Sequence, residues 1–237
     1  MNENPAAAAT PERPGVGLAE QVAADVVPPG SLPVDDSTTR STMTAPPATT
    51  QPDVAPGDEK LLPPITSFYG VRGQGKRFCF VVDNSASMRG YKMQNALQEL
   101  VAAIDKLKET EYFYVVFFSD GAYPMFWPAM EQDMLPATDE NKAKVAEWLT
   151  HVGLGPATRG LKAIRIAFDL KPDTIYLLGD GDFGDFTIAE AVRRKNAKIT
   201  VHTIGLDIGR NSAAERGFRL IAETFKGTYR NVPLSQP

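Results

Sequence analysis

The chain has 237 residues and a formal net charge of −4, a length that allows one sizeable α/β domain with a tail or two small domains. Residues 1–60 contain 10 of the 19 prolines, no Phe, Trp or Tyr, and 3 Lys/Arg against 9 Asp/Glu, a charge of −6. Such a stretch cannot bury enough apolar surface to offset the entropy lost on ordering. We therefore expect a disordered, acidic tail or linker rich in Pro, Ala and Thr over residues 1–60, and one folded domain over residues 61–237.

The remaining composition excludes several classes of protein. Residues 61–237 carry 22 Lys/Arg against 20 Asp/Glu, or +2, so no strong basic bias indicates a nucleic-acid partner. The N-terminus lacks a secretory signal pattern, and no run reaches the roughly 18 apolar residues of a membrane span, so we expect a chain that is soluble as given. Its location stays open between the cytoplasm and a membrane-anchored envelope protein whose anchor is absent here. The single cysteine, Cys79, excludes an internal disulfide and a multi-cysteine metal site.

The first half of the expected domain alternates buried strands with helices. The continuous apolar run RFCFVV (77–82) predicts a strand covered on both faces, and apolar residues at helical spacing from Met93 to Ile104 predict a helix. YFYVVFF (112–118) predicts a second strand. A turn at 119–121 then leads into AYPMFW, where Pro124 indicates an antiparallel edge strand because proline cannot donate a ladder hydrogen bond.

The second half continues the same alternation. The apolar faces of DENKAKVAEWLTHV (139–152) and of the segment after Thr158 predict two helices. They are followed by a strand TIYLLG (174–179), a helix TIAEAVRRKNA, a strand ITVHTIG (199–205), a helix with Ala214 to Phe225 on its face, and a short strand at 228–232. Strands alternating with helices imply right-handed crossovers. The predicted fold class is α/β: a doubly wound, Rossmann-like, mostly parallel six-stranded sheet with one antiparallel edge strand and helices on both faces.

Polar side chains follow two of the predicted strands. Asp83, Ser85 and Ser87 come directly after the strand 77–82, and Asp180 comes directly after TIYLLG. In doubly wound folds, ligands bind outside the carboxyl ends of the strands, so these residues are expected on one edge. Carboxylates and hydroxyls are hard oxygen donors that suit Mg²⁺, Mn²⁺ or Ca²⁺ and suit Zn²⁺ poorly. The sequence therefore predicts a divalent-cation site, with Mg²⁺ expected first and Mn²⁺ or Ca²⁺ as alternatives.

These residues, with two later motifs, make the sequence resemble a known family. Asp83-x-Ser85-x-Ser87 after a hydrophobic strand, Thr158 in a Gly-rich loop, and Asp180-Gly181 after a later strand resemble the metal-ion-dependent adhesion site of a von Willebrand factor type A domain. The resemblance covers roughly residues 66–232, and the segment TSFYGVRGQGKRFCFVVD is similar to bacterial, envelope-associated members of planctomycete type. It implies that the metal ligands are Asp83, Ser85, Ser87, Thr158 and Asp180, some of them acting through water.

The resemblance also implies a function and shows two departures. It implies a non-enzymatic adhesion or scaffold module in which the cation bridges to an exposed Asp or Glu of an unidentified protein partner. Ala86 stands where the family often has Gly, and Arg159 stands where Asp or Asn is frequent. Arg159 places a positive charge beside the expected metal, which is compatible with a weakened site or with a site that holds an acidic partner.

Alternative readings concern the same residues. Asp83, Ser85 and Ser87 are preferred helix-capping residues and could cap the helix that follows. The site could also be degenerate in a purely structural domain. Asp83 could act as the nucleophile of a Mg²⁺-dependent phosphoryl-transfer or hydrolytic enzyme, although Ser85 stands where haloacid-dehalogenase-type phosphatases carry a second Asp. We expect no catalytic residues.

Two further motifs are expected to be structural. Gly70 to Arg77 nearly spells a phosphate-binding loop, but Arg77 replaces the Ser/Thr and the loop precedes its strand. Asp182-Phe183-Gly184 is expected to be a turn, with Asp182 and Asp185 as solvated acids. Tyr123, Phe126 and Trp127 are expected to pack at the sheet edge more readily than to form a recognition surface.

Overall fold

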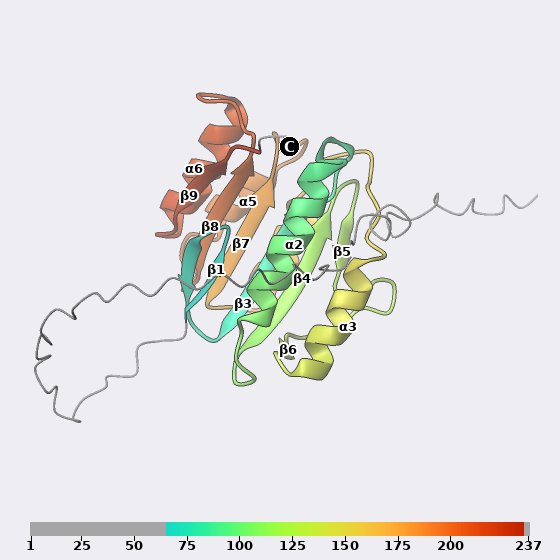
Figure 1. Ribbon diagram of the computed structural model, residues 1–237. Helices are drawn as coiled ribbons and strands as arrows, with labels where there is room; N and C mark the ends of the chain where they lie inside the picture. The colour runs from blue at the N-terminus through green and yellow to red at the C-terminus, as the bar shows by residue number, and fades with distance from the viewer. Residues whose placement is uncertain (1–64, 235–237) are drawn as a thin grey trace, which may run out of the picture.

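The computed structural model describes residues 65–234; the expected tail at 1–60 lies outside the described residues. A central sheet lies between two layers of helices (Figure 1). The strands are β1 (Ile65–Phe68), β2 (Val71–Gln74), β3 (Arg77–Asp83), β4 (Tyr112–Phe118), β5 (Ala122–Pro124), β6 (Leu135–Pro136), β7 (Thr174–Gly179), β8 (Thr200–Leu206) and β9 (Tyr229–Val232). The helices are α2 (Tyr91–Asp105), α3 (Asp139–Leu149), α4 (Leu161–Asp169), α5 (Thr187–Arg193) and α6 (Ala213–Thr224), with a 3₁₀ turn η1 (Ala86–Met88).

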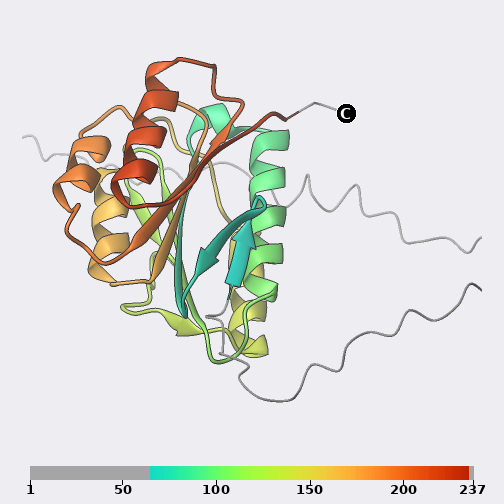
Figure 2. The same cartoon turned by 90° about the vertical axis from the view of Figure 1, so that its left-hand side faces the viewer.

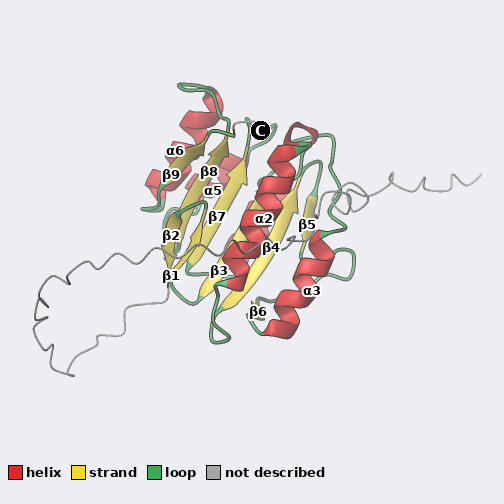
Figure 3. Cartoon of the chain, viewed as in Figure 1, coloured by secondary structure: helices red, strands yellow, loops and turns green. Residues whose placement is uncertain are grey.

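The main sheet has the order β5-β4-β3-β7-β8-β9. The five strands from β4 to β9 pair in parallel, while β5 pairs antiparallel with β4 at the edge, as the proline in its sequence predicted. Helices α2 and α3 cover one face and α4, α5 and α6 cover the other, as the two views show (Figures 2 and 3). The predicted fold class is therefore confirmed.

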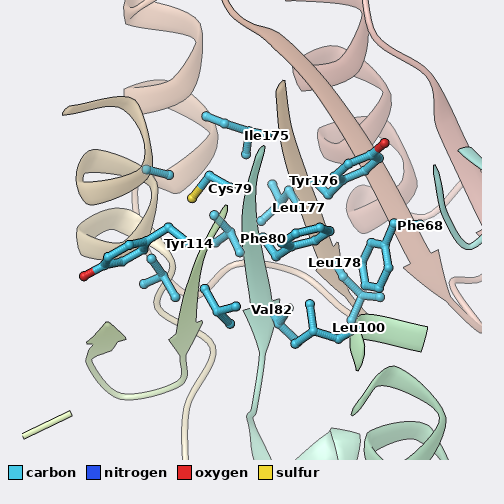
Figure 4. Close-up of a cluster of buried hydrophobic side chains, with 14 of the residues drawn as sticks. Phe68, Cys79, Phe80, Val82, Leu100, Tyr114, Ile175, Tyr176, Leu177 and Leu178 are labelled. Carbon is cyan, nitrogen blue, oxygen red and sulfur yellow. The ribbon is translucent and has the colours of Figure 1, made fainter. Parts of the chain in front are cut away.

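The core forms because the central strands are buried on both faces. Residues 78–83 of β3 and 174–179 of β7 are all buried, which explains why their sequences are continuous apolar runs. Phe68, Phe80 and Tyr176 pack together on one face, with ring centroids 5.4 to 5.7 Å apart (Figure 4). Cys79 is fully buried within this core, and burial raises the pKa of its thiol well above the usual range.

Two elements of the structure were not predicted. The two-residue strand β6 pairs antiparallel with β4, so the main sheet has seven strands where six were predicted, with a second short antiparallel strand in addition to β5. Strands β1 and β2 form a separate antiparallel hairpin beside α2. The hairpin contains most of the phosphate-loop-like sequence, with Gly70 and Gly75 in positive-φ turns, so this segment does not lead from a strand into a helix as a phosphate loop does.

A tyrosine of the main sheet holds the hairpin in place. The Tyr176 hydroxyl lies 3.0 Å from the Thr66 carbonyl oxygen and 3.2 Å from that of Val71. Gly73 permits this approach, because a Cβ there would lie 2.5 Å from the Tyr176 hydroxyl. Among residues 65–234, no helix combines the length and the apolar character needed to cross a membrane.

Candidate metal centre

The candidate site lies at the topological switch point of the sheet. If only the parallel strands are numbered along the chain, their order across the sheet (β4-β3-β7-β8-β9) is 2-1-3-4-5. The connections that follow β3 and β7 therefore leave the sheet on opposite sides. The crevice at such a point, outside the carboxyl ends of the strands, is where doubly wound folds bind ligands. Asp83 ends β3 and Asp180 follows β7, and the two strands are hydrogen-bonded neighbours. The predicted placement of both acids on one edge is thus observed.

Asp83 is a buried carboxylate with one oxygen unsatisfied. Its side chain is 0% exposed, and Oδ1 accepts the backbone N–H of Ser85 at 2.7 Å. Oδ2 is buried and has no hydrogen-bond partner among the described residues. Burial, with a further contribution from the charge of Asp180, raises the pKa of Asp83 to about 6. An unpaired carboxylate oxygen in such a place is expensive for the fold, which indicates a function for it.

Hydroxyl groups link the segment after β3 to Asp180. The Ser85 and Ser87 Oγ atoms lie 2.9 Å apart, and the Ser87 hydroxyl donates to Asp180 Oδ1 at 2.8 Å. Ser85 is buried, whereas Ser87 is exposed. The structure therefore brings together Asp83, Ser85, Ser87 and Asp180, with Ser87 on the solvent side.

Lys92 belongs to the same cluster, and the sequence analysis missed it. Its Nζ donates to Asp180 Oδ2 at 2.6 Å, and the side chains of Lys92 and Asp180 are 28% and 2% exposed. Both oxygens of Asp180 thus have partners. Lys92 lies nine residues after Asp83, on helix α2. Its partner Asp180 is 88 residues further along the chain, so no local sequence pattern predicts the contact.

Thr158 lies on a loop attached to both halves of the site. In that loop, the Gly155 N–H donates to the Asn84 carbonyl at 2.9 Å, and the Thr158 carbonyl accepts the N–H of Gly184 at 2.7 Å. Thr158 is half-buried, and the Arg159 side chain after it is exposed. The loop of Thr158 therefore contacts the segment after β3 and the segment after β7 through its backbone, and the role of Thr158 as a metal ligand stays a prediction.

Asp185 is not the solvated loop acid that we expected. Its Oδ2 accepts the N–H of Leu161, the first residue of α4, at 3.1 Å. Its Oδ1 accepts the N–H of Thr187, the first residue of α5, at 3.0 Å, and also the Thr187 hydroxyl. One carboxylate thus binds the starts of two helices, which is a favourable place for negative charge. Asp182 is exposed, as expected.

The hypothesis that Asp83, Ser85 and Ser87 cap the following helix is wrong. The N-cap of α2 is Gly90, and no side chain makes a capping hydrogen bond there. Ser85 is the N-cap residue of the short 3₁₀ turn η1, again without a side-chain capping bond. Ser85 and Ser87 instead direct their hydroxyls to each other and to Asp180. Their role must therefore be sought in the site itself.

The donor set fits a hard divalent cation. No group of three or more His, Cys, Asp or Glu side chains within residues 65–234 is arranged to hold a metal, so a carboxylate-rich or zinc-type site is not present in that part of the chain. The cluster instead offers the unsatisfied Asp83 Oδ2, the carboxylate of Asp180 and the hydroxyls of Ser85 and Ser87. Oxygen donors of this kind suit Mg²⁺, Mn²⁺ or Ca²⁺.

Comparisons with solved structures show the same fold in several proteins. A von Willebrand factor type A protein from Catenulispora acidiphila is 22% identical, with a TM-score of 0.58, over 68% of this chain and 40% of that chain. Proximal thread matrix protein 1 from the mussel byssus is 18% identical, with a TM-score of 0.53, over 65% and 41%. The vWF domain of the type V pili tip protein Mfa5 from Porphyromonas gingivalis is 13% identical, with a TM-score of 0.52, over 66% and 89%.

At these identities the comparisons show the shared fold alone, and the matches span about two fifths of the first two proteins. No curated protein matches the chain. The sequence profile of the von Willebrand factor type A domain matches residues 76–231, which is more than half of the chain. The chain belongs to the von Willebrand factor type A domain family.

Proposed function

We propose that this domain is a non-enzymatic module that binds a protein partner through a divalent cation, with Mg²⁺ expected first. Asp83, Ser85, Ser87, Thr158 and Asp180 would hold the ion, and a bound ion supplies a positive centre that takes a carboxylate oxygen of an Asp or Glu on the partner. The observation that carries the proposal is Asp83 Oδ2, a buried carboxylate oxygen without a partner at the switch point of the sheet.

The surroundings of the site support binding of a protein. Ser87 reaches solvent at the edge of the cluster. Phe186, on the loop that begins with Asp180, is 78% exposed. Exposed aromatic side chains are enriched at protein interfaces. The site thus offers a polar centre with apolar contact area on the same loop.

The enzyme alternative has no support from the described residues. Asp83 is fully buried, with Oδ1 fixed by the Ser85 N–H, whereas an attacking carboxylate must reach its substrate. Ser85 directs a hydroxyl to Ser87 at the position where a second acid would be needed. The resemblance to planctomycete-type members stays a prediction.

The ion-binding step is tested by titrating the full chain with Mg²⁺, Mn²⁺ and Ca²⁺ in a calorimeter. We expect one ion to bind with an affinity in the range of weak protein sites, roughly micromolar to millimolar. Asp83→Asn keeps the size of the side chain but removes its charge, so it should abolish binding while circular dichroism shows an unchanged fold. The matched control is Asp182→Asn, which removes one exposed negative charge nearby and should bind as the wild type does.

The partner step uses a synthetic peptide with a single glutamate and the same peptide with glutamine in its place. We expect the glutamate peptide to bind only when the ion is present and to dissociate on chelation, because the ion needs an anionic ligand. Unchanged ion binding in folded Asp83→Asn, or no ion binding by the wild type at millimolar concentration, would overturn the proposal. Equal binding of both peptides would overturn its partner step alone.

A further inference from the structure

Lys92 is placed as an internal cation of the site. It is the second residue of α2, so the helix fixes its backbone beside the segment that carries Asp83, Ser85 and Ser87. Its Nζ donates to Asp180 Oδ2 at 2.6 Å, which makes a charge-assisted hydrogen bond between two ionised groups. Asp180 is nearly fully buried, so the pair is shielded from solvent and from salt much more than a surface ion pair.

Three of the four carboxylate oxygens of Asp83 and Asp180 have hydrogen-bond partners. Asp180 Oδ1 accepts from Ser87 and Oδ2 from Lys92, and Asp83 Oδ1 accepts from the Ser85 N–H. Of these four carboxylate oxygens, Asp83 Oδ2 is the one without a partner among the described residues. An ion that binds Asp83 Oδ2 and also Asp180 must therefore share Asp180 with Lys92 or displace its ammonium group.

The net charge of the cluster determines whether a bound ion still requires an anionic ligand. Two carboxylates alone would neutralise a divalent cation. With Lys92 beside Asp180, the two carboxylates, the ammonium and the ion sum to +1. Arg159 and Arg89 are exposed and differ in this respect, since solvent screens their charges.

We propose that Lys92 sets both the ion affinity and the ligand preference of this site, by competing with the divalent cation for Asp180 and leaving the bound ion under-neutralised. The inference rests on the proposed function and deepens it. Lys92 weakens ion binding in the absence of a ligand, and it strengthens the demand of the bound ion for an anionic ligand. The partner carboxylate thus completes a charge balance that the protein itself leaves incomplete.

The test measures ion affinity in the full chain for wild type and Lys92→Met, a variant that keeps a long apolar stem but has no charge. We expect Lys92→Met to bind Mg²⁺ or Mn²⁺ roughly tenfold more tightly, because a like charge next to the ion is removed and Asp180 becomes free. Its melting temperature in chelator should fall, because a buried carboxylate loses its partner, and added ion should raise it more than in wild type. Arg89→Met removes an exposed charge from the same segment and should stay within about twofold of wild-type affinity.

The ligand preference gives a second readout that a purely structural role would not produce. In the presence of saturating ion, the single-glutamate peptide should bind Lys92→Met several-fold more weakly than wild type, although the ion binds more tightly. Lys92→Arg, which keeps the charge, should retain the wild-type pattern. If Lys92→Met does not fold without ion, Lys92→Gln retains a hydrogen-bond donor to Asp180 and should show the same opposite changes at smaller amplitude.

The outcomes separate this inference from the proposed function. Equal ion affinity in wild type and Lys92→Met, or weaker binding in the folded variant, overturns the role of Lys92 and leaves the ion-binding proposal intact. Ion binding by Lys92→Met but not by wild type supports the competition and overturns the proposed function of the natural chain. Absence of ion binding in every variant overturns both.

Discussion

At the residue scale, the buried polar residues Asp83 and His202 differ in whether their side-chain atoms have hydrogen-bond partners. Asp83 keeps an unsatisfied oxygen, and burial raises its pKa to about 6. His202, on β8, is satisfied: its Nδ1 accepts the N–H of Thr228 at 3.0 Å and its ring stacks on Tyr176 at 5.3 Å. The unsatisfied oxygen of Asp83 requires an explanation, which a bound cation would supply, whereas His202 is accounted for as part of the core.

His202 leads to a prediction on the pH dependence of stability. Burial lowers the pKa of His202 below its ordinary value of 6.5, because protonation would bury a charge and convert the acceptor Nδ1 into a donor. At a pH below 6.5 the unfolded chain therefore binds this proton more readily than the folded chain. The contribution of neutral His202 is fully present above pH 6.5 and is lost as the pH falls through and below that value. Asp83, whose pKa burial raises to about 6, contributes with the opposite sign in the same range, so the effect of His202 is the difference between wild type and a variant without this histidine.

The measurement is urea unfolding between about pH 5.5 and 7.5. The free energy of unfolding of wild type minus that of His202→Gln should decrease as the pH falls across this range. His151→Gln removes the other histidine of the chain, which is exposed, and should keep the wild-type slope. A wild-type slope in His202→Gln would contradict the assignment.

At the element scale, the loop between β7 and α5 connects the site to the helices. It begins with Asp180, donates a hydrogen bond to the Thr158 carbonyl through Gly184, and accepts the first N–H groups of α4 and α5 through Asp185. Phe183 of the same loop packs on Phe118 and Phe218. The loop that carries a ligand is therefore held on several sides, which restricts the positions that Asp180 can take.

Asp185→Ala should destabilise the domain by about 1 to 3 kcal/mol, because two helix N-termini lose their acceptor at once. The free energy of unfolding from chemical denaturation measures this change. Asp182→Ala, three residues earlier and exposed, should change it by no more than about 0.5 kcal/mol. A loss in Asp185→Ala no larger than in this control would show that the two helix starts do not depend on the carboxylate.

At the scale of the whole molecule, the matched family profile and the described fold lie within residues 65–234. We expect residues 1–60 to contribute little to stability, since they contain no aromatic residue and 10 prolines. Deletion of residues 1–60 should leave the melting temperature within about 2 °C of the full chain. A larger decrease in a calorimetric scan would show that this segment packs on the domain.

The sequence alone was enough to predict the α/β alternation, and with it the fold class and the edge on which Asp83 and Asp180 meet. Strands buried on both faces are continuous apolar runs, and parallel strands joined by helices have one allowed handedness, so these features can be deduced without coordinates. The hairpin β1–β2 escaped prediction because VRGQ is short and glycine-containing, and β6 because two residues carry no periodicity.

Only the tertiary structure decided which polar atoms are satisfied. Lys92 pairs with Asp180 across 88 residues of sequence, and Asp185 binds Leu161 across 24. These contacts depend on how a helix and a loop settle against the sheet, because a shift of a few ångströms separates a charge-assisted hydrogen bond from none. Local residue patterns determined the architecture and the place of the site, whereas packing between distant segments determined its charge balance and left one oxygen of Asp83 unsatisfied.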